Sequence, residues 1–221
     1  MKRIIRNLCV AAAVVCGACQ GEASLITWSA SPGVSIPDNS PNAGAASDIY
    51  IAPGDSQLTG ILNPSVTSVA SVQFTITGGW DGDYKLVLSH TDGTASQSVT
   101  LVNMLLGGAA ANSGFNNVTL SPASGSDTAV ASTSSTSPIA GTCYGIDFNP
   151  FQHISPTGDW LLYVTDNAAG DQGVLSGWSL SLDVVPEPVN VALWIFGGMM
   201  GILAFARSRR TRRLFGENLK C

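Results

Sequence analysis

Aspartates are the side chains of this sequence best suited to chemistry, and most of them lie in its middle. Residues 24–185 hold twelve aspartates, no glutamate and one basic residue, Lys85, so this region has a net charge of −11. A surface of this sign repels phosphate backbones, which excludes nucleic acid as a partner. Aspartate is also the short acid favoured in turns and in tight calcium loops, so binding of a divalent cation is the first chemistry to weigh.

Asp166, Asn167 and Asp171 are the best candidate ligands for calcium. They bring hard oxygen atoms into one glycine-containing loop, but they lack the one-three-five spacing and the terminal glutamate of a full calcium loop. Turn capping is the simpler interpretation, in which Asp166 and Asn167 accept hydrogen bonds from backbone N–H groups. We therefore expect no cofactor, with calcium as the alternative. The next candidate ligands are Asp38, Asp81 and Asp83.

Catalytic motifs are missing from the sequence. Its two histidines, His90 and His153, have no neighbours with the spacing of a His-Glu-x-x-His zinc site, and no Gly-x-Ser-x-Gly sequence is present. His90 lies in a Ser-His-Thr-Asp-Gly stretch and is expected to be a solvated loop residue. Asp81 and Asp83 could form a glycosidase-like pair, but two acids this close in a turn more often bind backbone amides or a cation. We expect a protein that is not an enzyme.

Apolar residues recur at every second position through the middle of the chain, a pattern typical of β-strands with one buried face. Clusters of Gly, Pro, Asn and Asp separate these runs, and we expect polar loops at residues 29–42 and 127–138. The pattern predicts one all-β domain over residues 24–184, an antiparallel β-sandwich with Trp160 and Trp178 in its core. The runs are Val72, Phe74 and Ile76; Tyr84, Leu86 and Leu88; Val99 and Leu101; Trp160, Leu162 and Val164; and Trp178, Leu180, Leu182 and Val184.

Cysteine usage adds one constraint on this domain. Cys143 is its one cysteine, since the other four lie in the two end segments, so no disulfide can form within it. In an oxidising compartment such a residue is buried or pairs with another chain. Burial is the more frequent outcome, and we expect it here.

The N-terminal residues have the layout of an export signal. Three basic residues among the first six precede an apolar run at residues 8–18, and small residues follow. This layout predicts a signal peptide over residues 1–23, cut by signal peptidase between Ala23 and Ser24. Lipidation at Cys19 and an uncleaved signal anchor are the alternatives.

The C-terminal residues combine three features in a fixed order. Val185, Pro186, Glu187 and Pro188 come first, and the prolines hold this segment extended, as a processing enzyme would require. Residues 189–206 carry no charge and would rise about 27 Å as a helix, close to the thickness of a bilayer core. A basic cluster then marks a cytoplasmic end under the positive-inside rule. The cluster consists of Arg207, Arg209, Arg210, Arg212 and Arg213.

This order of motif, apolar stretch and arginines resembles the PEP-CTERM sorting signal of Gram-negative bacteria, which an exosortase recognises. The alternative is a plain single-pass anchor with a chance pair of prolines. The resemblance implies export across the inner membrane, transient anchoring through residues 189–206, and delivery to the cell envelope or extracellular matrix. Exopolysaccharide or biofilm is the implied setting. Residues 214–221 would form a short cytoplasmic tail beyond the usual end of such signals.

A second resemblance covers residues 33–184. Five segments are similar to the P domain, the β-sandwich that follows the catalytic domain in proprotein convertases and many bacterial subtilases. The match implies a jelly-roll-like sandwich without catalytic residues, because the protease of that family lies in a separate domain. The segments are residues 36–39, 80–89, 114–120, 156–166 and 173–180, of which the last two are the most diagnostic.

Three classes of function follow from the sequence. The first is a non-catalytic surface or matrix protein, exported and sorted by an exosortase. The second is a module that binds carbohydrate, such as exopolysaccharide, or protein. An exposed aromatic side chain at Trp80 or Tyr144 would favour this second class, whereas burial of both would favour the first. The third, a secreted hydrolase, is disfavoured by the missing catalytic motifs.

Overall fold

The computed structural model describes residues 22–103, 114–125, 138–186 and 196–202. The contacts between Cα atoms divide the chain into two units, of which Ala23–Val185 is one and Met1–Glu22 with Pro186–Cys221 is the other. In the second unit, residues 196–202 form a short helix with exposed side chains. The first unit contains all the strands apart from the last residue of β10.

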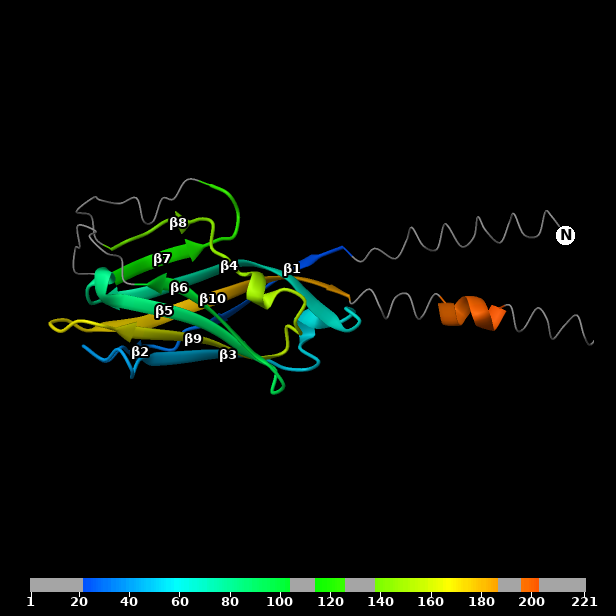
Figure 1. Ribbon diagram of the computed structural model, residues 1–221, viewed down its shortest axis with the longest axis horizontal. Helices are drawn as coiled ribbons and strands as arrows, with labels where there is room; N and C mark the ends of the chain where they lie inside the picture. Colours follow the sequence, from blue (N-terminus) through cyan, green and yellow to red (C-terminus); the bar gives the residue numbers. More distant parts are fainter. Residues whose placement is uncertain (1–21, 104–113, 126–137, 187–195, 203–221) are drawn as a thin grey trace, which may run out of the picture. The chain divides into compact units, whose positions relative to one another are not determined.

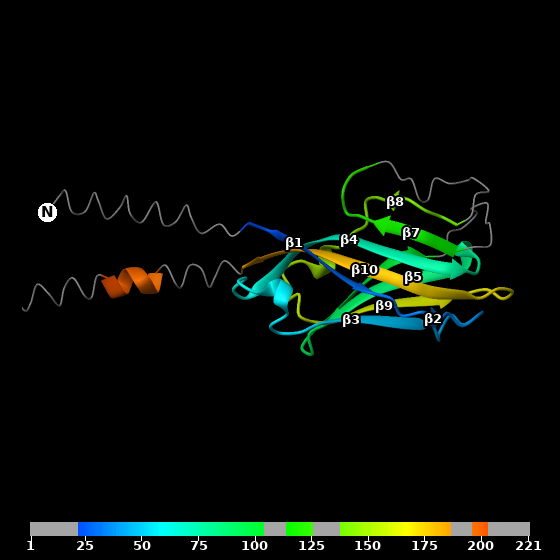
Figure 2. The same cartoon turned by 180° about the vertical axis from the view of Figure 1, so that it is seen from behind.

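Two sheets form the Ala23–Val185 unit (Figures 1 and 2). The named strands pair antiparallel, except that β7 and β8 pair in parallel. Side chains from both sheets meet in one hydrophobic core. This confirms the predicted all-β, antiparallel fold. The strand order in the first sheet is β1 (Ser24–Ala30), β10 (Gly173–Pro186), β4 (Pro64–Gly78), β7 (Gly114–Leu120) and β8 (Thr142–Cys143). The short strand β2 (Val34–Ser35) also pairs with β10. The strand order in the second sheet is β3 (Ala45–Ile51), β9 (Gly158–Asp166), β5 (Tyr84–Thr91) and β6 (Ser96–Asn103).

Period-two alternation places one face of each central strand in the core. On β5 every second residue from Tyr84 to His90 is buried, and on β9 Trp160 and Leu162 have no exposed surface. These strands pair so that Leu88 lies opposite Leu162. Trp178 on β10 is also buried. Four of the five predicted runs are therefore confirmed, because successive side chains of a strand point to opposite faces.

Strand β6 departs from the predicted alternation. Val99 is half-buried, whereas Leu101 and its neighbour Val102 are both buried. The ladder shifts here, because Leu86 pairs with Val102 while Val87 pairs with Thr100. An extra residue on one strand of an antiparallel pair is a β-bulge, and it turns two successive side chains toward the same face.

The expectation of a polar loop at residues 29–42 is wrong in part. The end of β1 and the two residues of β2 lie there, and Ile36 is fully buried with its N–H donating to the Gly173 carbonyl at 2.8 Å. Within the other expected loop, residues 127–137 lie outside the described part of the chain. Cys143 on β8 is half-buried and packs against the core, so its predicted burial is incomplete.

In the described part of the chain, three short 3-10 turns lie between strands. They are η1 (Ser56–Leu58), η2 (Asp81–Asp83) and η3 (Asn149–Phe151). The turn η2 leads directly into β5, and Phe151 of η3 packs on the Trp160 ring with 5.2 Å between ring centroids. Turns of this kind place polar loops at the ends of the sandwich while the strands hold its core.

Most residues of the predicted export and sorting signals lie outside the described part of the chain. This applies to residues 1–21 of the signal peptide, to Glu187 and Pro188 of the motif, to the arginine cluster and to residues 214–221. Of the predicted span at residues 189–206, the structure describes 196–202. Among the described residues, no helix has the length and apolar character needed to cross a bilayer.

His90 is a core residue and not the solvated loop residue expected from the sequence. It lies near the end of β5 with 3% of its surface exposed. Its ring packs against Trp160 with 4.4 Å between centroids and the ring planes tilted by 45°, and its Nε2 is hydrogen-bonded to the Thr157 carbonyl at 3.1 Å. Burial lowers the pKa of His90, although the Thr157 carbonyl and the nearby Asp92 and Asp159 act in the opposite direction.

This depressed pKa predicts a specific dependence of stability on pH. The unfolded chain binds a proton at His90 near pH 6.5, whereas the folded chain resists it. The neutral ring therefore stabilises the fold fully above that value, and its contribution is lost as pH falls through the folded-state pKa. His90→Gln, whose amide can still donate to Thr157, should unfold in urea with a flatter pH dependence between pH 7.5 and 5. Identical pH slopes in the two proteins would contradict this prediction.

Candidate functional site

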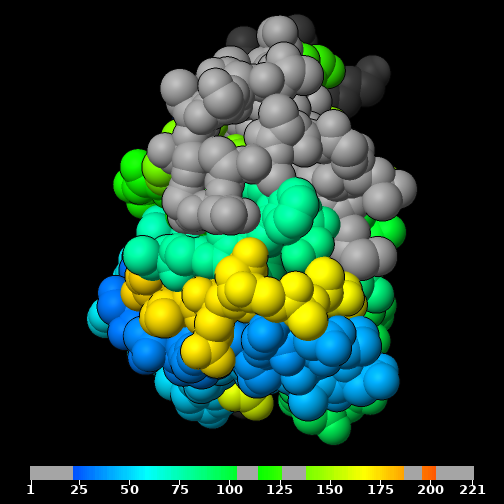
Figure 3. Space-filling model, turned by 90° about the vertical axis from the view of Figure 1, so that its left-hand side faces the viewer, coloured from blue at the N-terminus to red at the C-terminus, as the bar shows by residue number. Residues whose placement is uncertain are grey.

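Three loops meet at one end of the sandwich, the left-hand end in Figure 1. The loop after β9 lies between the loop after β2 and the turn η2. Hydrogen bonds between main-chain groups hold the loops together. The Ser40 N–H donates to the Asp166 carbonyl at 2.7 Å, and the Asn167 N–H donates to the Asp83 carbonyl at 3.0 Å. Figure 3 looks onto this end, where yellow atoms of the loop after β9 lie among blue and teal atoms of the other two.

These loops bring together five aspartates from three segments that are far apart in the sequence. We call this group the acidic end, and its members are Asp38, Asp81, Asp83, Asp166 and Asp171. Two of the ligands predicted from the sequence, Asp166 and Asp171, therefore lie at the same end of the sandwich as Asp38, Asp81 and Asp83, the next candidate ligands. The third, Asn167, has its side-chain nitrogen bonded to the Asp83 carbonyl at 2.8 Å, so it acts as a donor that ties two loops together.

Asp166 is the most unusual member of the acidic end. It ends strand β9 and has no exposed surface. Its Oδ1 accepts a hydrogen bond from the Ala168 N–H at 3.2 Å, which is the turn-capping bond considered from the sequence. Its Oδ2 is buried and has no hydrogen-bond partner. Burial raises the pKa of this carboxyl, and repulsion from Asp171, Asp38 and Asp83 raises it further.

The neighbouring carboxylates are held by backbone amides. Asp171 Oδ1 accepts from the Trp80 N–H at 2.8 Å, and both oxygens of Asp38 accept from the Gly170 N–H at 3.2 and 3.3 Å. These bonds connect the loop after β9 with the other two loops. Backbone N–H groups thus hold these two carboxylates in place, and no described lysine or arginine belongs to these loops.

The remaining two acids, Asp81 and Asp83, also have raised pKa values. Burial raises the pKa of Asp81, and Asp83 and Asp171 add to the effect. The pKa of Asp83 is also raised, first by desolvation and then by Asp171 and Asp38. Even so, within the described part of the chain no group of three His, Cys, Asp or Glu side chains is arranged to hold a metal ion by itself.

An exposed aromatic residue adjoins the acidic end. Trp80 precedes η2 and keeps 43% of its surface exposed, whereas Tyr144 is half-buried. The preceding Gly79 has a φ of +69°, and a Cβ atom there would overlap the Tyr84 hydroxyl. That hydroxyl donates to the Gly78 carbonyl at 3.2 Å. Tyr84 therefore supports the backbone that presents Trp80 beside the acids.

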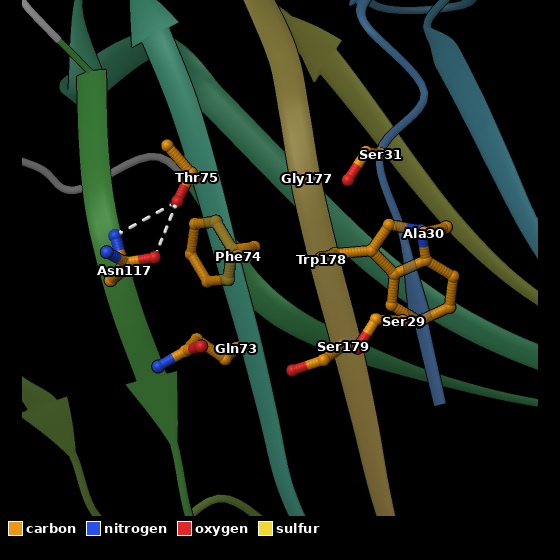
Figure 4. A pocket seen from close by; sticks show the side chains of 10 residues that line it. All are labelled: Ser29, Ala30, Ser31, Gln73, Phe74, Thr75, Asn117, Gly177, Trp178 and Ser179. Carbon is orange, nitrogen blue, oxygen red and sulfur yellow. Dashed lines mark hydrogen bonds between the residues drawn. The ribbon is translucent and has the colours of Figure 1, made fainter. Parts of the chain in front are cut away.

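A shallow hollow of about 190 Å³ lies on the outer face of the first sheet (Figure 4). Gly177 is one of its lining residues, and a Cβ atom there would make an ordinary contact 3.5 Å from the Ala30 carbonyl oxygen. Thr75 and Asn117 form a hydrogen-bonded pair at its edge. The polar groups lining it are neutral hydroxyls and amides, which suit an uncharged, hydroxyl-rich ligand. Its lining residues are Ser29, Ala30, Ser31, Gln73, Phe74, Thr75, Asn117, Gly177, Trp178 and Ser179.

The geometry also separates the histidines from the acidic end. Tyr84, next to the acidic end, and His90 lie near opposite ends of β5, roughly 20 Å apart along the strand at a rise of about 3.3 Å per residue. His153 is exposed on the loop after η3. The acidic end therefore has no described histidine to serve as a general base.

The two predicted processing sites lie at the ends of one pair of strands. Ser24 begins β1 and pairs with Val184 on β10, two residues before that strand ends at Pro186. Ala23 and Ser24 are exposed, and Val185 is half-buried. Chain cleavage at either predicted position would thus fall at the margin of the β1–β10 ladder.

No protein-family model and no curated protein matches the chain. Among solved structures, the chain is similar to one chain in the crystal structure of a complex between an Aeromonas sobria serine protease and its chaperone. The two are 16% identical with a TM-score of 0.44, and the match covers 78% of this chain and 29% of that chain. This chain therefore spans less than a third of the length of that neighbour. A likeness of this size assigns neither a family nor an activity.

Proposed function

We propose that the chain is an exported, non-catalytic surface or extracellular-matrix protein that an exosortase sorts through Val185, Pro186, Glu187 and Pro188. One observation carries the proposal: the compact unit Ala23–Val185 is bounded by the two predicted processing positions. Cleavage there would leave a complete sandwich. The setting is a cell envelope or matrix rich in exopolysaccharide.

The pairing at the margin of the sandwich supports this proposal. Ser24 and Val184 are partners in the β1–β10 ladder, and among the described residues this pair is the last one toward the two termini. Pro186 cannot donate a ladder hydrogen bond, so it is suited to end β10 and to begin an extended segment. An enzyme that cuts after it would not have to unfold the domain.

The same proposal includes the finer assignments. It makes the sandwich a jelly roll of the P-domain type, residues 1–23 a cleaved signal peptide, and residues 189–206 a membrane helix that anchors the precursor. The five arginines would stay on the cytoplasmic side and hold the precursor in place until cleavage. Export and sorting would then deliver a domain whose net charge of −11 keeps it soluble outside the cell.

A carbohydrate- or protein-binding module is the second candidate, and the exposure of Trp80 favours it. A tryptophan with 43% of its surface exposed offers an apolar face for a sugar ring or a partner side chain. The acidic end beside it supplies hydrogen-bond acceptors. This candidate is compatible with sorting, since a matrix protein can bind the polymer around it.

Replacing both Pro186 and Glu187 by alanine tests the sorting proposal. In a host with the exosortase, the variant should accumulate as a full-length, membrane-retained form, because the enzyme loses the extended motif that it recognises. Membrane fractionation with immunoblotting measures this outcome. Pro53→Ala, in an exposed loop of the sandwich, is the matched control and should mature normally. Normal maturation of the double variant would refute the proposal.

A further inference from the structure

The described strands of the first sheet carry almost no charge, although the domain as a whole is strongly acidic. Of the described aspartates in residues 24–185, Asp183 alone lies on one of these strands, and Lys85 lies on β5 of the second sheet. The outward positions of β1, β4, β7 and β10 are filled mainly by serine, threonine, asparagine and glutamine. We call the outward side of these four strands the neutral face. A ligand on it meets hydroxyl and amide groups.

Hydrogen bonds between neighbouring strands order many side chains of the neutral face. The hydroxyl oxygens of Thr27 on β1 and Ser181 on β10 lie 2.8 Å apart, and those of Thr77 on β4 and Ser176 on β10 lie 2.8 Å apart as well. Binding to side chains that are already ordered loses less conformational entropy than binding to mobile ones. The neutral face is therefore preorganised for a ligand that forms many hydrogen bonds.

The hollow of Figure 4 lies on the neutral face, and three of its hydroxyls are available to a ligand. Ser29, Ser31 and Ser179 line it, and their side chains make no hydrogen bond to any described residue. Ser29 and Ser179 lie opposite each other in the β1–β10 ladder. Each hydroxyl can donate one hydrogen bond and accept two, so these serines match the hydroxyl groups of a sugar.

A β-bulge forms the other side of the hollow. The ladder between β4 and β7 shifts between Phe74 and Ile76, and Asn117 has a φ of +50° there. The Asn117 Oδ1 accepts from the Thr75 hydroxyl at 3.1 Å, and its backbone N–H donates to the same hydroxyl at 3.1 Å. Its side-chain Nδ2 donates to no described residue. Bulges redirect side chains and are common next to active sites, and this one adds an amide donor to the hollow.

The size of the hollow and the charge of the domain indicate an uncharged polymer. The volume of about 190 Å³ is smaller than the ~300 Å³ or more of a pocket that encloses a drug-sized molecule. The hollow is shallow and its lining comes from β1, β4, β7 and β10, so a chain can place one unit in it and continue across the neutral face. A polyanion would be repelled by a domain with a net charge of −11, whereas an uncharged chain is not.

We propose that the hollow binds one sugar unit of an uncharged polysaccharide and that the neutral face around it binds the neighbouring units. Ser29, Ser31 and Ser179 form hydrogen bonds to the sugar hydroxyls from one side, and Asn117 does so from the other. This inference rests on the carbohydrate-binding candidate described above, and it assigns that candidate a site other than Trp80. It is independent of sorting, because it concerns the folded domain and not its processing.

Affinity electrophoresis of the full-length protein in a nonionic detergent measures this binding. The gels contain the neutral polymers hydroxyethylcellulose, galactomannan or dextran, or the anionic carboxymethylcellulose. We expect at least one neutral polymer to retard the protein to an extent that added salt does not change, because no charges attract the partners. Carboxymethylcellulose should not retard it. Retardation by carboxymethylcellulose, or by none of the neutral polymers, would overturn the proposal.

A pair of serine substitutions locates the site. Ser29→Ala combined with Ser179→Ala should raise the dissociation constant for the retarding polymer about tenfold, as expected for the loss of two hydrogen bonds between neutral groups. Ser89→Ala combined with Ser98→Ala is the matched control, because these serines are ladder partners on β5 and β6 of the second sheet. The control should bind like the unsubstituted protein. Equal affinities of the two double variants would overturn the proposal.

Gly177→Gln provides a second test by filling the hollow. A Cβ atom at Gly177 would lie 3.5 Å from the Ala30 carbonyl oxygen and 3.8 Å from the Ser31 hydroxyl, which are ordinary contacts with two lining residues. The variant should therefore keep a melting temperature close to that of the unsubstituted protein and lose the retardation. Full retardation of a folded Gly177→Gln variant would overturn the proposal.

Trp80→Ala separates this site from the alternative site at the exposed tryptophan. The variant should bind the polymer like the unsubstituted protein, because Trp80 does not line the hollow. Loss of binding in Trp80→Ala together with full binding in Gly177→Gln would overturn this inference and leave the carbohydrate-binding candidate with its site at Trp80. None of these outcomes changes the maturation measured for the sorting proposal, so the two can fail separately.

Discussion

Replacing Trp160 by alanine is expected to lower the free energy of unfolding by about 3–5 kcal/mol. The indole has no exposed surface, packs between His90 and Phe151, and donates from Nε1 to the Pro156 carbonyl at 2.9 Å. Alanine would leave a cavity and a buried carbonyl without its donor. Urea unfolding, with comparison of midpoints at equal slope, measures the loss.

Trp80→Ala is the matched control for this substitution. The same atoms are removed from a side chain that is 43% exposed, so the expected change is within about 1 kcal/mol. If Trp160→Ala were as stable as Trp80→Ala, the register that places β9 across β5 in the core would be wrong.

Gly79→Ala is expected to destabilise the protein by about 2–5 kcal/mol. Its φ of +69° strains any residue with a Cβ atom, and that atom would also overlap the Tyr84 hydroxyl. Tyr84 is buried and cannot move outward without breaking its bond to the Gly78 carbonyl. The destabilisation should be visible as a lower melting temperature, together with a changed fluorescence of the adjacent Trp80.

Gly93→Ala separates the two causes. Gly93 has a φ of +86° but no neighbouring atom within 4 Å of an added Cβ, so the variant carries the backbone strain alone. It should cost about 1–2 kcal/mol. Equal losses in the two variants would show that Tyr84 does not restrict Gly79, and that the backbone before Trp80 is freer than the structure indicates.

Strands β4, β5, β9 and β10 could be predicted from the alternation of their large apolar residues, whereas β1 and β3 were not predicted. Trp160 and Trp178 mark the inward faces of β9 and β10 unambiguously. On β3 the inward positions are filled by Ala45, Ser47, Ile49 and Ile51, so half of the buried face carries small residues and the alternation is weak. Ser47 is buried because its hydroxyl is bonded to Trp178 Nε1 at 2.9 Å, a tertiary contact that no local pattern contains.

A β-bulge and a buried polar residue were also not predicted from the sequence. The shift that buries Val102 depends on pairing between β5 and β6, and period-two counting assumes a regular ladder. His90 was placed in solvent because of its Ser-His-Thr-Asp-Gly neighbours. Its position on the inward face of β5 follows from continuing the alternation of Tyr84, Leu86 and Leu88 by one more step.

The acidic end could be predicted in part. Asp166, Asn167 and Asp171 lie within six residues, so the sequence could place them in one loop. Their meeting with Asp38 and Asp83 depends on how the sheets bring three distant loops together. The buried, unpaired Oδ2 of Asp166 is a property of packing that the sequence does not show, whereas its Oδ1 accepts the turn-capping hydrogen bond expected from the sequence.

The position of the sandwich within the chain joins the fold to the proposed function. A domain that begins at Ser24 and whose last strand ends at Pro186 occupies the segment that export and sorting would release. Its acidic surface and its exposed Trp80 support the proposed structural or binding role outside the cell. In that proposal, both properties belong to the released domain, and the two ends would determine its destination.

Intact-mass analysis of the secreted protein, from hosts with and without the exosortase, tests this assignment most directly. With the enzyme, we expect a chain that begins at Ser24 and ends within or directly after the motif formed by Val185, Pro186, Glu187 and Pro188. Without it, the chain should remain in the membrane fraction with residues 189–221 still attached. Secreted protein that retains residues 189–221 in the host with the enzyme would contradict the proposed sorting.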